Sequence, residues 1–356
     1  MAFSRLARLR VRMQEKGVDT LLVSSLPNIR YLSGFTGSHA LMIVRQRRAV
    51  FVTDTRYATQ SAREVHGVRR VVSRDSLMNA VHDHGLLDGC RIVGFESNQV
   101  TYAIYRELRR RFPSLRFVPT SDLVEGIAVV KEPAEIRILE SAARISDEVF
   151  REILPMLRPG VMERDIAAEI SYLHRRHGAD GDAFEPIVAS GERGSLPHAR
   201  ATSRMLRNRE FVTLDFGCRV KGYHSDLTRT VGLGRVSQRQ RQIYHAVLHA
   251  QEQAVRSARP NMAARDLDAV ARNAIDKAGF GKYFTHSLGH GLGLHVHERP
   301  RISALSRDTL VAGNVITIEP GIYIPGHLGV RIEDDVLITA DGSRRITQAP
   351  KELMVL

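Results

Sequence analysis

Short apolar runs alternate with amphipathic segments over the first third of the chain. The apolar runs predict buried strands at residues 19–24, 41–45, 49–53, 92–95 and 116–118. Helical spacing of apolar residues predicts helices at 1–16, 57–65 and 102–112. The segment 28–38, NIRYLSGFTGS, is rich in Gly and Ser and indicates a loop. Strands that alternate with helices predict an α/β domain over residues 1–122.

The pattern changes in the segment GIAVVKEPAEI, residues 126–136. Pro133 stands where a helix tolerates proline, in its first turn, and the residues of one apolar stripe follow: Ile136, Leu139, Ala143 and Ile145. Further helices are predicted at 162–177, 237–257 and 263–278. Apolar segments that carry acids lie between and after them: FVTLDFG, YHSDLTRTVGL, VITIEPGIYI and VRIEDDVLIT. Together these elements predict an α+β domain over residues 123–356.

The first two acid-bearing segments predict a hairpin that pairs two carboxylates. A carboxylate inside an apolar strand is unfavourable unless another group pairs with it. A turn near Val220–Gly222 places Asp215 opposite Asp226, or diagonal to it on the same face if the register shifts by two residues. Opposed Cβ atoms would lie ~4.5–5.5 Å apart.

The last two acid-bearing segments repeat this arrangement. A turn centred on Gly326 places Glu319 opposite Glu333. Like charges that face each other destabilise a sheet, so a cation between the carboxylates explains both pairs better than two surface positions do. Four carboxylates with one imidazole suit two divalent ions, and two-metal sites are a common device for hydrolysis.

Composition sets the broad class. The chain has 356 residues, of which 43% are hydrophobic and 26% charged, as in globular proteins. No apolar run reaches the ~18 residues of a membrane span, and the Arg-rich start lacks the apolar core of a secretory signal. Two cysteines, Cys90 and Cys218, provide no disulfide framework. We therefore expect a cytoplasmic protein with no membrane partner.

Basic residues outnumber acidic ones, 52 to 39, which gives a net charge of +13. They are mostly Arg and are dispersed, apart from short clusters such as RQRR (45–48) and RRR (109–111). Neither a zinc finger nor an RNA-recognition motif nor a row of stacking aromatic residues accompanies them. We interpret the charge as a solvated surface, so a nucleic-acid partner is not favoured and polyanion binding is the alternative.

Several motifs, in this order and spacing, resemble the metallopeptidases of the pita-bread fold. They are DFG-x4-GY-x-SD-x-TRT (215–230), HSLGHGLGLHVHERP (286–300), IEPGIYIPG (318–326) and GVRIEDDVLI (329–338). Within that group they are most similar to the Xaa-Pro peptidases, proline dipeptidase (prolidase) and aminopeptidase P, and less to methionine aminopeptidase. The segment LPNIRYLSGFTGS resembles the family's creatinase-type N-terminal domain. The resemblance thus implies a creatinase-type α/β domain followed by a pita-bread α+β domain.

The resemblance implies five metal ligands: Asp215, Asp226, His290, Glu319 and Glu333. Asp226 and Glu333 would bridge two divalent ions, Asp215 would bind one of them, and His290 and Glu319 the other. The two hairpins indicate the same four acids. Oxygen ligands with one imidazole favour Mn²⁺, with Co²⁺, Zn²⁺ or Fe²⁺ as alternatives.

The resemblance also assigns residues around the metal ions. Glu319 would take the proton of a metal-bridging hydroxide and return it to the leaving nitrogen. His198 and His297 would contact the substrate carbonyl or its oxyanion. His286 and Arg331 would bind substrate, and Arg331 would pair with the carboxylate of a C-terminal proline.

These features predict an Xaa-Pro dipeptidase that acts on proline-containing dipeptides or short peptides, and family resemblance implies a homodimer. Aminopeptidase P is the alternative. A non-catalytic pita-bread module that binds polyanions or proteins is less favoured, as is a creatinase-like amidinohydrolase, because all five ligand positions are filled. His295 stands where the family often has Glu, and PGHLG (325–329) departs from PG-x-GG, so substrate preference stays open.

Overall fold

The computed structural model describes residues 2–356, which form two compact units. The first unit ends at Ala128, and the second runs from Val129 to Leu356. Helix α6 (Glu125–Ala128), which follows the division expected after residue 122, packs within the first unit. Asn28 Nδ2 donates a hydrogen bond to Glu125 Oε1 at 2.7 Å, and the Tyr31 hydroxyl donates one to the carbonyl of Ile127 at 3.2 Å. None of the helices in residues 2–356 is long and apolar enough to span a bilayer.

A six-stranded sheet forms the core of the first unit, in the order β4-β3-β2-β1-β5-β6. Only β2 is antiparallel to its neighbours. The strands are β1 (Thr20–Val23), β2 (Ala40–Arg45), β3 (Ala49–Asp54), β4 (Arg69–Ser73), β5 (Ile92–Glu96) and β6 (Arg116–Thr120). The helices are α1 (Ala2–Glu15), α2 (Leu26–Ser33), α3 (Ala58–Glu64), α4 (Leu77–Asp83) and α5 (Tyr102–Arg111), with the 3₁₀ turn η1 (Thr55–Tyr57). All of the strands and helices predicted for this region are present.

The predicted loop at residues 28–38 is wrong in its first half, which forms helix α2. Pro27 occupies the first turn of this helix, and Gly34 ends it with a positive φ of 81°. Ile29 and Leu32 are fully buried, so the tertiary packing of this eight-residue helix outweighs the loop preference of the neighbouring Gly and Ser residues. Strand β4 and helix α4 were not predicted, because their apolar segments are short.

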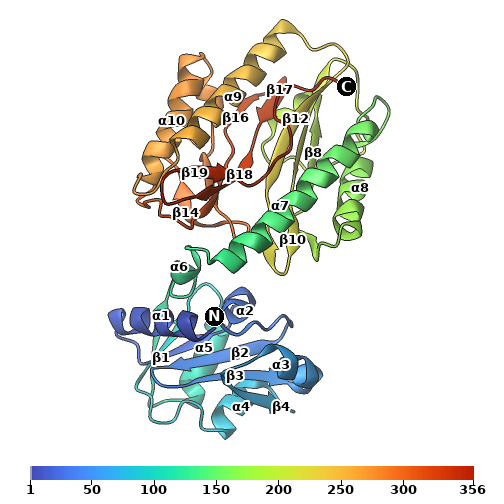
Figure 1. Cartoon of the computed structure of the whole chain (residues 1–356). Coiled ribbons are helices and arrows are strands. Elements are labelled where there is room, and N and C mark those ends of the chain that lie inside the picture. The colour runs from blue at the N-terminus through green and yellow to red at the C-terminus, as the bar shows by residue number, and fades with distance from the viewer. Residues whose placement is uncertain (1) are drawn as a thin grey trace. The chain divides into compact units, whose positions relative to one another are not determined.

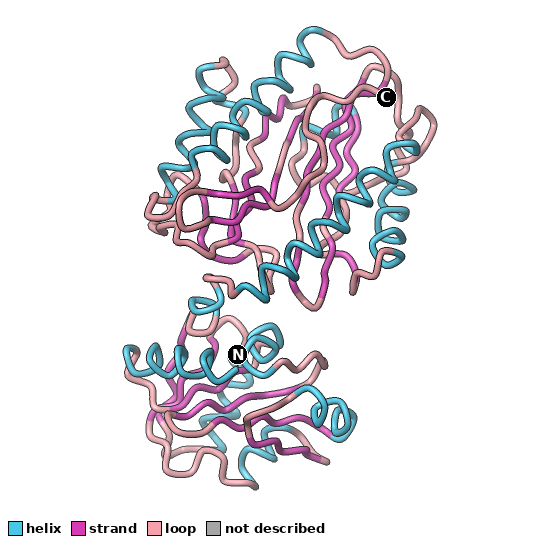
Figure 2. The backbone as a smooth tube through the Cα atoms, in the orientation of Figure 1, coloured by secondary structure: helices cyan, strands magenta, loops and turns pink. Residues whose placement is uncertain are grey.

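In the second unit, two pairs of helices lie on the outside of the strands (Figures 1 and 2). The helices are α7 (Pro133–Ile153), which has Pro133 in its first turn as predicted, and α8 (Glu163–Arg176), α9 (Gln238–Ser257) and α10 (Ala264–Lys277), which match the predicted bounds to within two residues. The strands of the first half are β7 (Gly181–Asp182), β8 (Ile187–Ser190), β9 (Glu210–Phe216), β10 (Cys218–Val220), β11 (Tyr223–His224) and β12 (Leu227–Leu233). Those of the second half are β13 (Gly289–Gly291), β14 (Glu298–Ile302), β15 (Val315–Ile318), β16 (Gly321–Ile324), β17 (Leu328–Arg331), β18 (Asp334–Ile338) and β19 (Ser343–Arg345).

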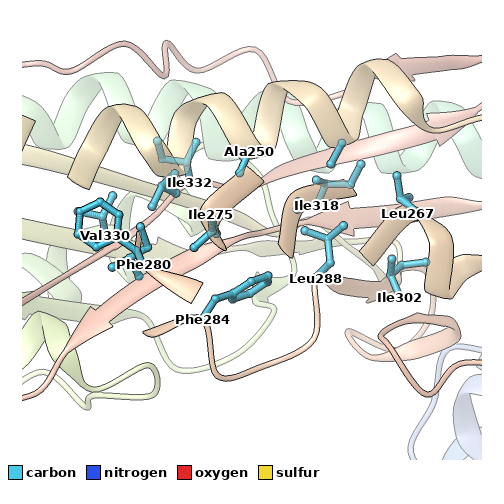
Figure 3. Close-up of a cluster of buried hydrophobic side chains, with 14 of the residues drawn as sticks. Ala250, Leu267, Ile275, Phe280, Phe284, Leu288, Ile302, Ile318, Val330 and Ile332 are labelled. Atoms are coloured by element: carbon cyan, nitrogen blue, oxygen red, sulfur yellow. The ribbon is translucent and has the colours of Figure 1, made fainter. Parts of the chain in front are cut away.

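Each helix pair covers its own apolar core. Residues of α7 and α8, such as Phe150 and Ile170, pack against β8, β9 and β12. Residues of α9 and α10, such as Ala250 and Ile275, pack against β15 to β18, where Ile318 and Val330 are fully buried (Figure 3). The strands between the two cores are therefore held from both sides, which makes them a rigid platform for polar side chains.

The first predicted hairpin forms with its register shifted by two residues. Its turn is Lys221–Gly222, and both residues have positive φ, 47° and 77°, as a two-residue type I′ turn requires. Thr228 therefore faces Asp215, and Asp226 is the diagonal neighbour of Asp215 on the same face. This is the second of the two registers that the sequence allowed.

The second predicted hairpin has the expected register. Ile322 pairs with Val330 around Gly326, and Ile318 pairs with Asp334 farther along the same hairpin. The ladder of backbone hydrogen bonds is interrupted between these two parts, at Glu319 and Glu333. The same register, continued across the interruption, places these two residues opposite each other. Because of this interruption, the side chains of Glu319 and Glu333 do not follow the alternating directions of a regular strand.

Candidate metal centre

A cavity of about 780 Å³ opens in the second unit, and all nine residues predicted for the site line it. They are Asp215, Asp226, His290, Glu319, Glu333, His198, His286, His297 and Arg331. They come from β9, β17 and the ends of β12, β15 and β18, from the segment around β13, and from the loop before β9. The fold therefore gathers residues that are far apart in the sequence around one space.

Three of these side chains, from three different strands or strand ends, approach one another closely. One ligand atom each of Asp226, His290 and Glu333 lies within 4.8 Å of the other two, a group that could hold a metal ion. His290 Nε2 is 3.8 Å from Asp226 Oδ2 and 3.4 Å from Glu319 Oε1. Asp215 lines the same cavity and is diagonal to Asp226 in the sheet.

The backbone around His290 fixes the direction of its ring. His290 Nδ1 donates to the carbonyl of Gly291 at 3.1 Å, so the lone pair is on Nε2 and faces the acids. A Cβ at Gly289 would lie 2.1 Å from the Thr317 carbonyl oxygen, and one at Gly291 would lie 2.1 Å from the Arg299 carbonyl oxygen. The two glycines are therefore required because β13 passes so close to β15 and β14.

Burial and mutual repulsion make this acid cluster unfavourable when it is ionised. Burial raises the pKa of Glu319 to about 8, and it raises the pKa of Asp226 and Glu333 well above their usual range, with repulsion between the acids adding to it. Asp226 Oδ1 is buried without a hydrogen-bond partner among the described residues. Burial lowers the pKa of His290 to about 4, so its imidazole is neutral at pH 7. Four acids, an unpartnered oxygen and a neutral imidazole fit divalent cations.

Arg331 is engaged by the protein on all sides. Its side chain is 4% exposed and forms an ion pair with Asp215. Nη1 donates to the Pro197 carbonyl at 3.0 Å and to the Tyr323 hydroxyl at 2.8 Å, while Nε donates to Thr228 Oγ1 at 3.1 Å. Arg331 therefore orients Asp215 and has little capacity left for substrate.

The hydrogen bonds of Arg331 continue to His286. The Tyr323 hydroxyl accepts from Arg331 and donates to His286 Nε2 at 2.9 Å, and His286 Nδ1 donates to the Ser287 carbonyl at 2.7 Å. Burial lowers the pKa of His286 to about 4 and so keeps the ring neutral. Both ring nitrogens are thus occupied by protein partners. Tyr323 lies within the motif IEPGIYIPG, but no pattern in the sequence singled it out.

The other histidines of the segment 286–298 have different positions. His297 is exposed at the cavity, and its ring stands edge-on to His290 with centroids 4.3 Å apart. His198, also exposed, lines the cavity as well. His295 is half-buried and is not among the lining residues.

The cavity contains one more cation that the sequence did not single out, Arg301 on β14. This side chain is exposed, and it makes no hydrogen bond or ion pair with any of residues 2–356. Only its backbone N–H is used, in a hydrogen bond to Asp308 Oδ2 at 2.9 Å. An isolated arginine on a strand gives no signal in a single sequence, so only the fold could reveal it.

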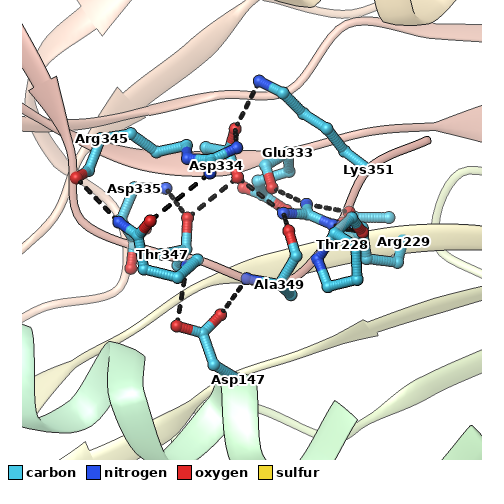
Figure 4. A network of polar contacts seen from close by, with 12 residues as sticks. Asp147, Thr228, Arg229, Glu333, Asp334, Asp335, Arg345, Thr347, Ala349 and Lys351 are labelled. Carbon is cyan, nitrogen blue, oxygen red and sulfur yellow. Dashed lines mark hydrogen bonds and ion pairs between the residues drawn. The ribbon is translucent and has the colours of Figure 1, made fainter. Parts of the chain in front are cut away.

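A buried ionic network lies behind Glu333 (Figure 4). Asp334 accepts hydrogen bonds from Arg229 Nη2 at 2.7 Å and from Lys351 Nζ at 3.1 Å. Arg229, 1% exposed, also donates to the carbonyls of Thr228 and Glu333. Thr228 Oγ1 donates to Glu333 Oε2 at 2.6 Å. The network therefore fixes the backbone and the carboxylate of one predicted ligand.

Comparisons with known families agree with this layout. The model for "Metallopeptidase family M24" matches residues 137–340, and the model for "Creatinase/Prolidase N-terminal domain" matches residues 5–130. These matches, together with the solved structures below, confirm the predicted fold class, a creatinase-type α/β domain followed by a pita-bread α+β domain.

Three relatives span nearly the whole chain. An Xaa-Pro dipeptidase from Pyrococcus horikoshii is 37% identical, with 96% of each chain covered. The solved structure of an Xaa-Pro dipeptidase from Bacillus anthracis is 39% identical, with a TM-score of 0.96 and 100% of both chains covered. The solved structure of an X-Pro aminopeptidase from Thermotoga maritima is 33% identical, with a TM-score of 0.90, covering 97% of this chain and 100% of that one.

Proposed function

The chain belongs to metallopeptidase family M24 and is a hydrolase, and on this premise we propose that it cleaves the Xaa-Pro bond of dipeptides. The family implies divalent metal ions. We propose that Asp215, Asp226, His290, Glu319 and Glu333 would hold two such ions. Mn²⁺ is our choice because the ligands are mostly oxygen atoms with one imidazole. When bound, such ions would supply Lewis acidity, which makes water a nucleophile near neutral pH and polarises the substrate carbonyl.

The protein's own residues supply the remaining steps. Glu319 can accept a proton at its carboxylate from the attacking water and deliver it to the proline nitrogen that leaves. His198 and His297 stand exposed at the cavity, where their ring N–H groups can donate to the carbonyl oxygen as it gains charge. An Xaa-Pro bond has no N–H, so the site must hold its substrate through other groups.

The position of Arg301 in the cavity favours a dipeptide as the substrate. A dipeptidase needs a cation near the metal centre for the carboxylate of the C-terminal proline, and Arg301 offers a guanidinium free of protein partners. We propose this role for Arg301 in place of Arg331, whose groups are engaged by Asp215, Pro197 and Tyr323. His286, with both ring nitrogens occupied, is proposed to position Tyr323 rather than to bind substrate.

The experiment compares two substrates with the Mn²⁺-loaded protein. Ala-Pro should be hydrolysed with a higher kcat/KM than a tripeptide Xaa-Pro-Yaa. Arg301→Ala should raise KM for Ala-Pro at least ~10-fold with a small change in kcat, because a charge-assisted hydrogen bond contributes about 1.5–3 kcal/mol. Arg301→Lys, which retains the charge, should restore part of the affinity.

Aminopeptidase P is the second candidate, since the name of the Thermotoga maritima structure describes that activity. A preference for the tripeptide, with KM for Ala-Pro unchanged in Arg301→Ala, would favour it and would refute the dipeptidase assignment. A protein that binds no divalent ion and hydrolyses neither substrate would refute both.

A further inference from the structure

The two units carry very unequal shares of the positive charge. The first unit, which ends at Ala128, contains 20 of the 52 Lys and Arg residues and 11 of the 39 Asp and Glu residues, a net charge of +9. The second unit is larger, yet its 32 basic and 28 acidic residues leave only +4. The metal centre lies in the second unit, so the peptidase reaction gives no reason for this excess.

The fold brings much of this charge to one side of the six-stranded sheet, the row of strand ends that we call its edge. Strands β1, β3, β4, β5 and β6 run in the same direction, so they begin at the same edge, and the antiparallel strand β2 ends there. The arginines at or next to these strand ends are Arg45, Arg47, Arg48, Arg69, Arg70, Arg91 and Arg116. All except Arg45 are exposed.

Helix α5 adds the second basic cluster to the same edge. It connects β5 to the parallel strand β6, so its last turn, residues 109–111, returns to the edge where β6 begins. The cluster RQRR lies at the turn between β2 and β3, on that edge as well. Two basic clusters that are far apart in the sequence thus lie on the same side of the first unit.

The β2–β3 turn also borders a cavity of about 430 Å³, lined by Arg45, Gln46, Arg47 and Arg48 together with Asp19, Thr20 and Gly89. Arg45 is fixed there because Nη1 donates to the Asp88 carbonyl at 3.0 Å. The side chains of Arg47 and Arg48 make no hydrogen bond or ion pair within residues 2–356. Asp19, the acid of this cavity, uses Oδ2 to accept the backbone N–H groups of Arg91 and Ile92, at 3.1 and 3.0 Å.

We propose that this basic edge, the seven arginines named above and residues 109–111, binds the phosphate backbone of a nucleic acid. Six strands at ~4.8 Å spacing give a row about 24 Å long, which corresponds to the length of about seven base pairs of duplex at ~3.4 Å rise along the helix axis. A single phosphate would occupy the cavity alone and would not reach the other arginines of the row, of which Arg70 also donates to Ser61 and Arg111 is paired with Glu107. One guanidinium can donate to two phosphate oxygens at once. The edge therefore offers contacts to the phosphate backbone.

The test uses the full-length chain and a fluorescently labelled 20-base-pair DNA duplex, with anisotropy measured from low to high KCl. We expect salt-dependent binding that Arg47→Glu/Arg48→Glu weakens at least ~10-fold, with a salt slope shallower by about 2, since each lost phosphate contact removes roughly 0.9. The matched control, Arg235→Glu/Arg241→Glu, makes the same charge change at exposed positions of the second unit and should alter affinity less than ~3-fold. Both variants should keep wild-type hydrolysis of Ala-Pro.

Other outcomes overturn the proposal. Absence of salt-dependent binding by the wild type, or an equal loss in the control variant, would show that the edge is only a solvated surface. Equal displacement of the DNA by polyglutamate of the same charge would show a preference for any acidic chain instead of phosphate. Dissociation of a dimer by the 47/48 variant, with no DNA binding by the wild type, would assign the edge to contact between copies of the chain. Competition by inorganic polyphosphate, by contrast, would support recognition of phosphate.

Discussion

Removing the metal ions should make the stability of the protein fall as pH rises from 6.5 to 8. Burial raises the pKa of Glu319 from 4.5 to about 8 in the metal-free fold. Within this window the folded chain keeps the proton and the unfolded chain has lost it, so the folded state binds more protons and stability decreases with rising pH. Asp226 and Glu333 act in the same direction, because burial and their acidic neighbours raise their pKa values too.

The size of the effect follows from the window. One carboxyl group that titrates only in the folded state costs about 1.4 kcal/mol per pH unit, or roughly 2 kcal/mol between pH 6.5 and 8. For a unit of this size that corresponds to a fall in Tm of about 4–8 °C. The pH range starts at 6.5 because burial lowers the pKa values of His286 and His290 to about 4. Below pH 6.5 these two histidines therefore make stability rise with pH, opposite to the effect of the acids.

The assay is thermal unfolding of EDTA-treated protein across this pH range, followed by the addition of Mn²⁺. Binding at 100 times Kd adds about 2.7 kcal/mol per ion, and the gain in Tm should be larger at pH 8, where protons no longer compete for the carboxylates. Glu319→Gln should flatten the slope of the metal-free protein. A metal-free Tm that stays constant or rises between pH 6.5 and 8 would refute the account of the buried acids.

Three substitutions test how the fold supports the site. Tyr323→Phe removes the hydroxyl between Arg331 and the imidazole of His286, so kcat for Ala-Pro should fall at least ~10-fold while metal content, measured by elemental analysis, stays near wild type. Arg229→Met leaves the carboxylate of Asp334 buried without its main partner and should lower the free energy of unfolding by ~3–5 kcal/mol in urea titration; a loss below ~1 kcal/mol would contradict a central role for the network. Gly289→Ala forces a Cβ to within 2.1 Å of a carbonyl oxygen of β15 and should weaken Mn²⁺ binding at least ~10-fold by calorimetry; unchanged affinity would mean that the strand adjusts freely.

The register of the second hairpin shows how far local pattern can reach. Gly326 has a φ of 67°, and the chain around it alternates so regularly that the turn fixed the pairing of Ile322 with Val330 and of Ile318 with Asp334. For the first hairpin the sequence allows two registers, because a turn at Val220–Lys221 and one at Lys221–Gly222 both fit the pattern. The positive φ of Lys221 and Gly222 selected the second turn, and this moved the register by two residues.

The sequence by itself determined the helices of the second unit, its acid-bearing strands, the four acids of the two hairpins and the family, because apolar periodicity and motif spacing are local properties of the chain. Contacts between distant segments decided the rest. The ion pair of Arg331 with Asp215, the free guanidinium of Arg301 in the cavity and the row of arginines along one sheet edge arise from packing and strand direction, which no single segment encodes. Helix α2 follows the same rule, since eight residues with weak propensity become helical only when Ile29 and Leu32 have a core to enter.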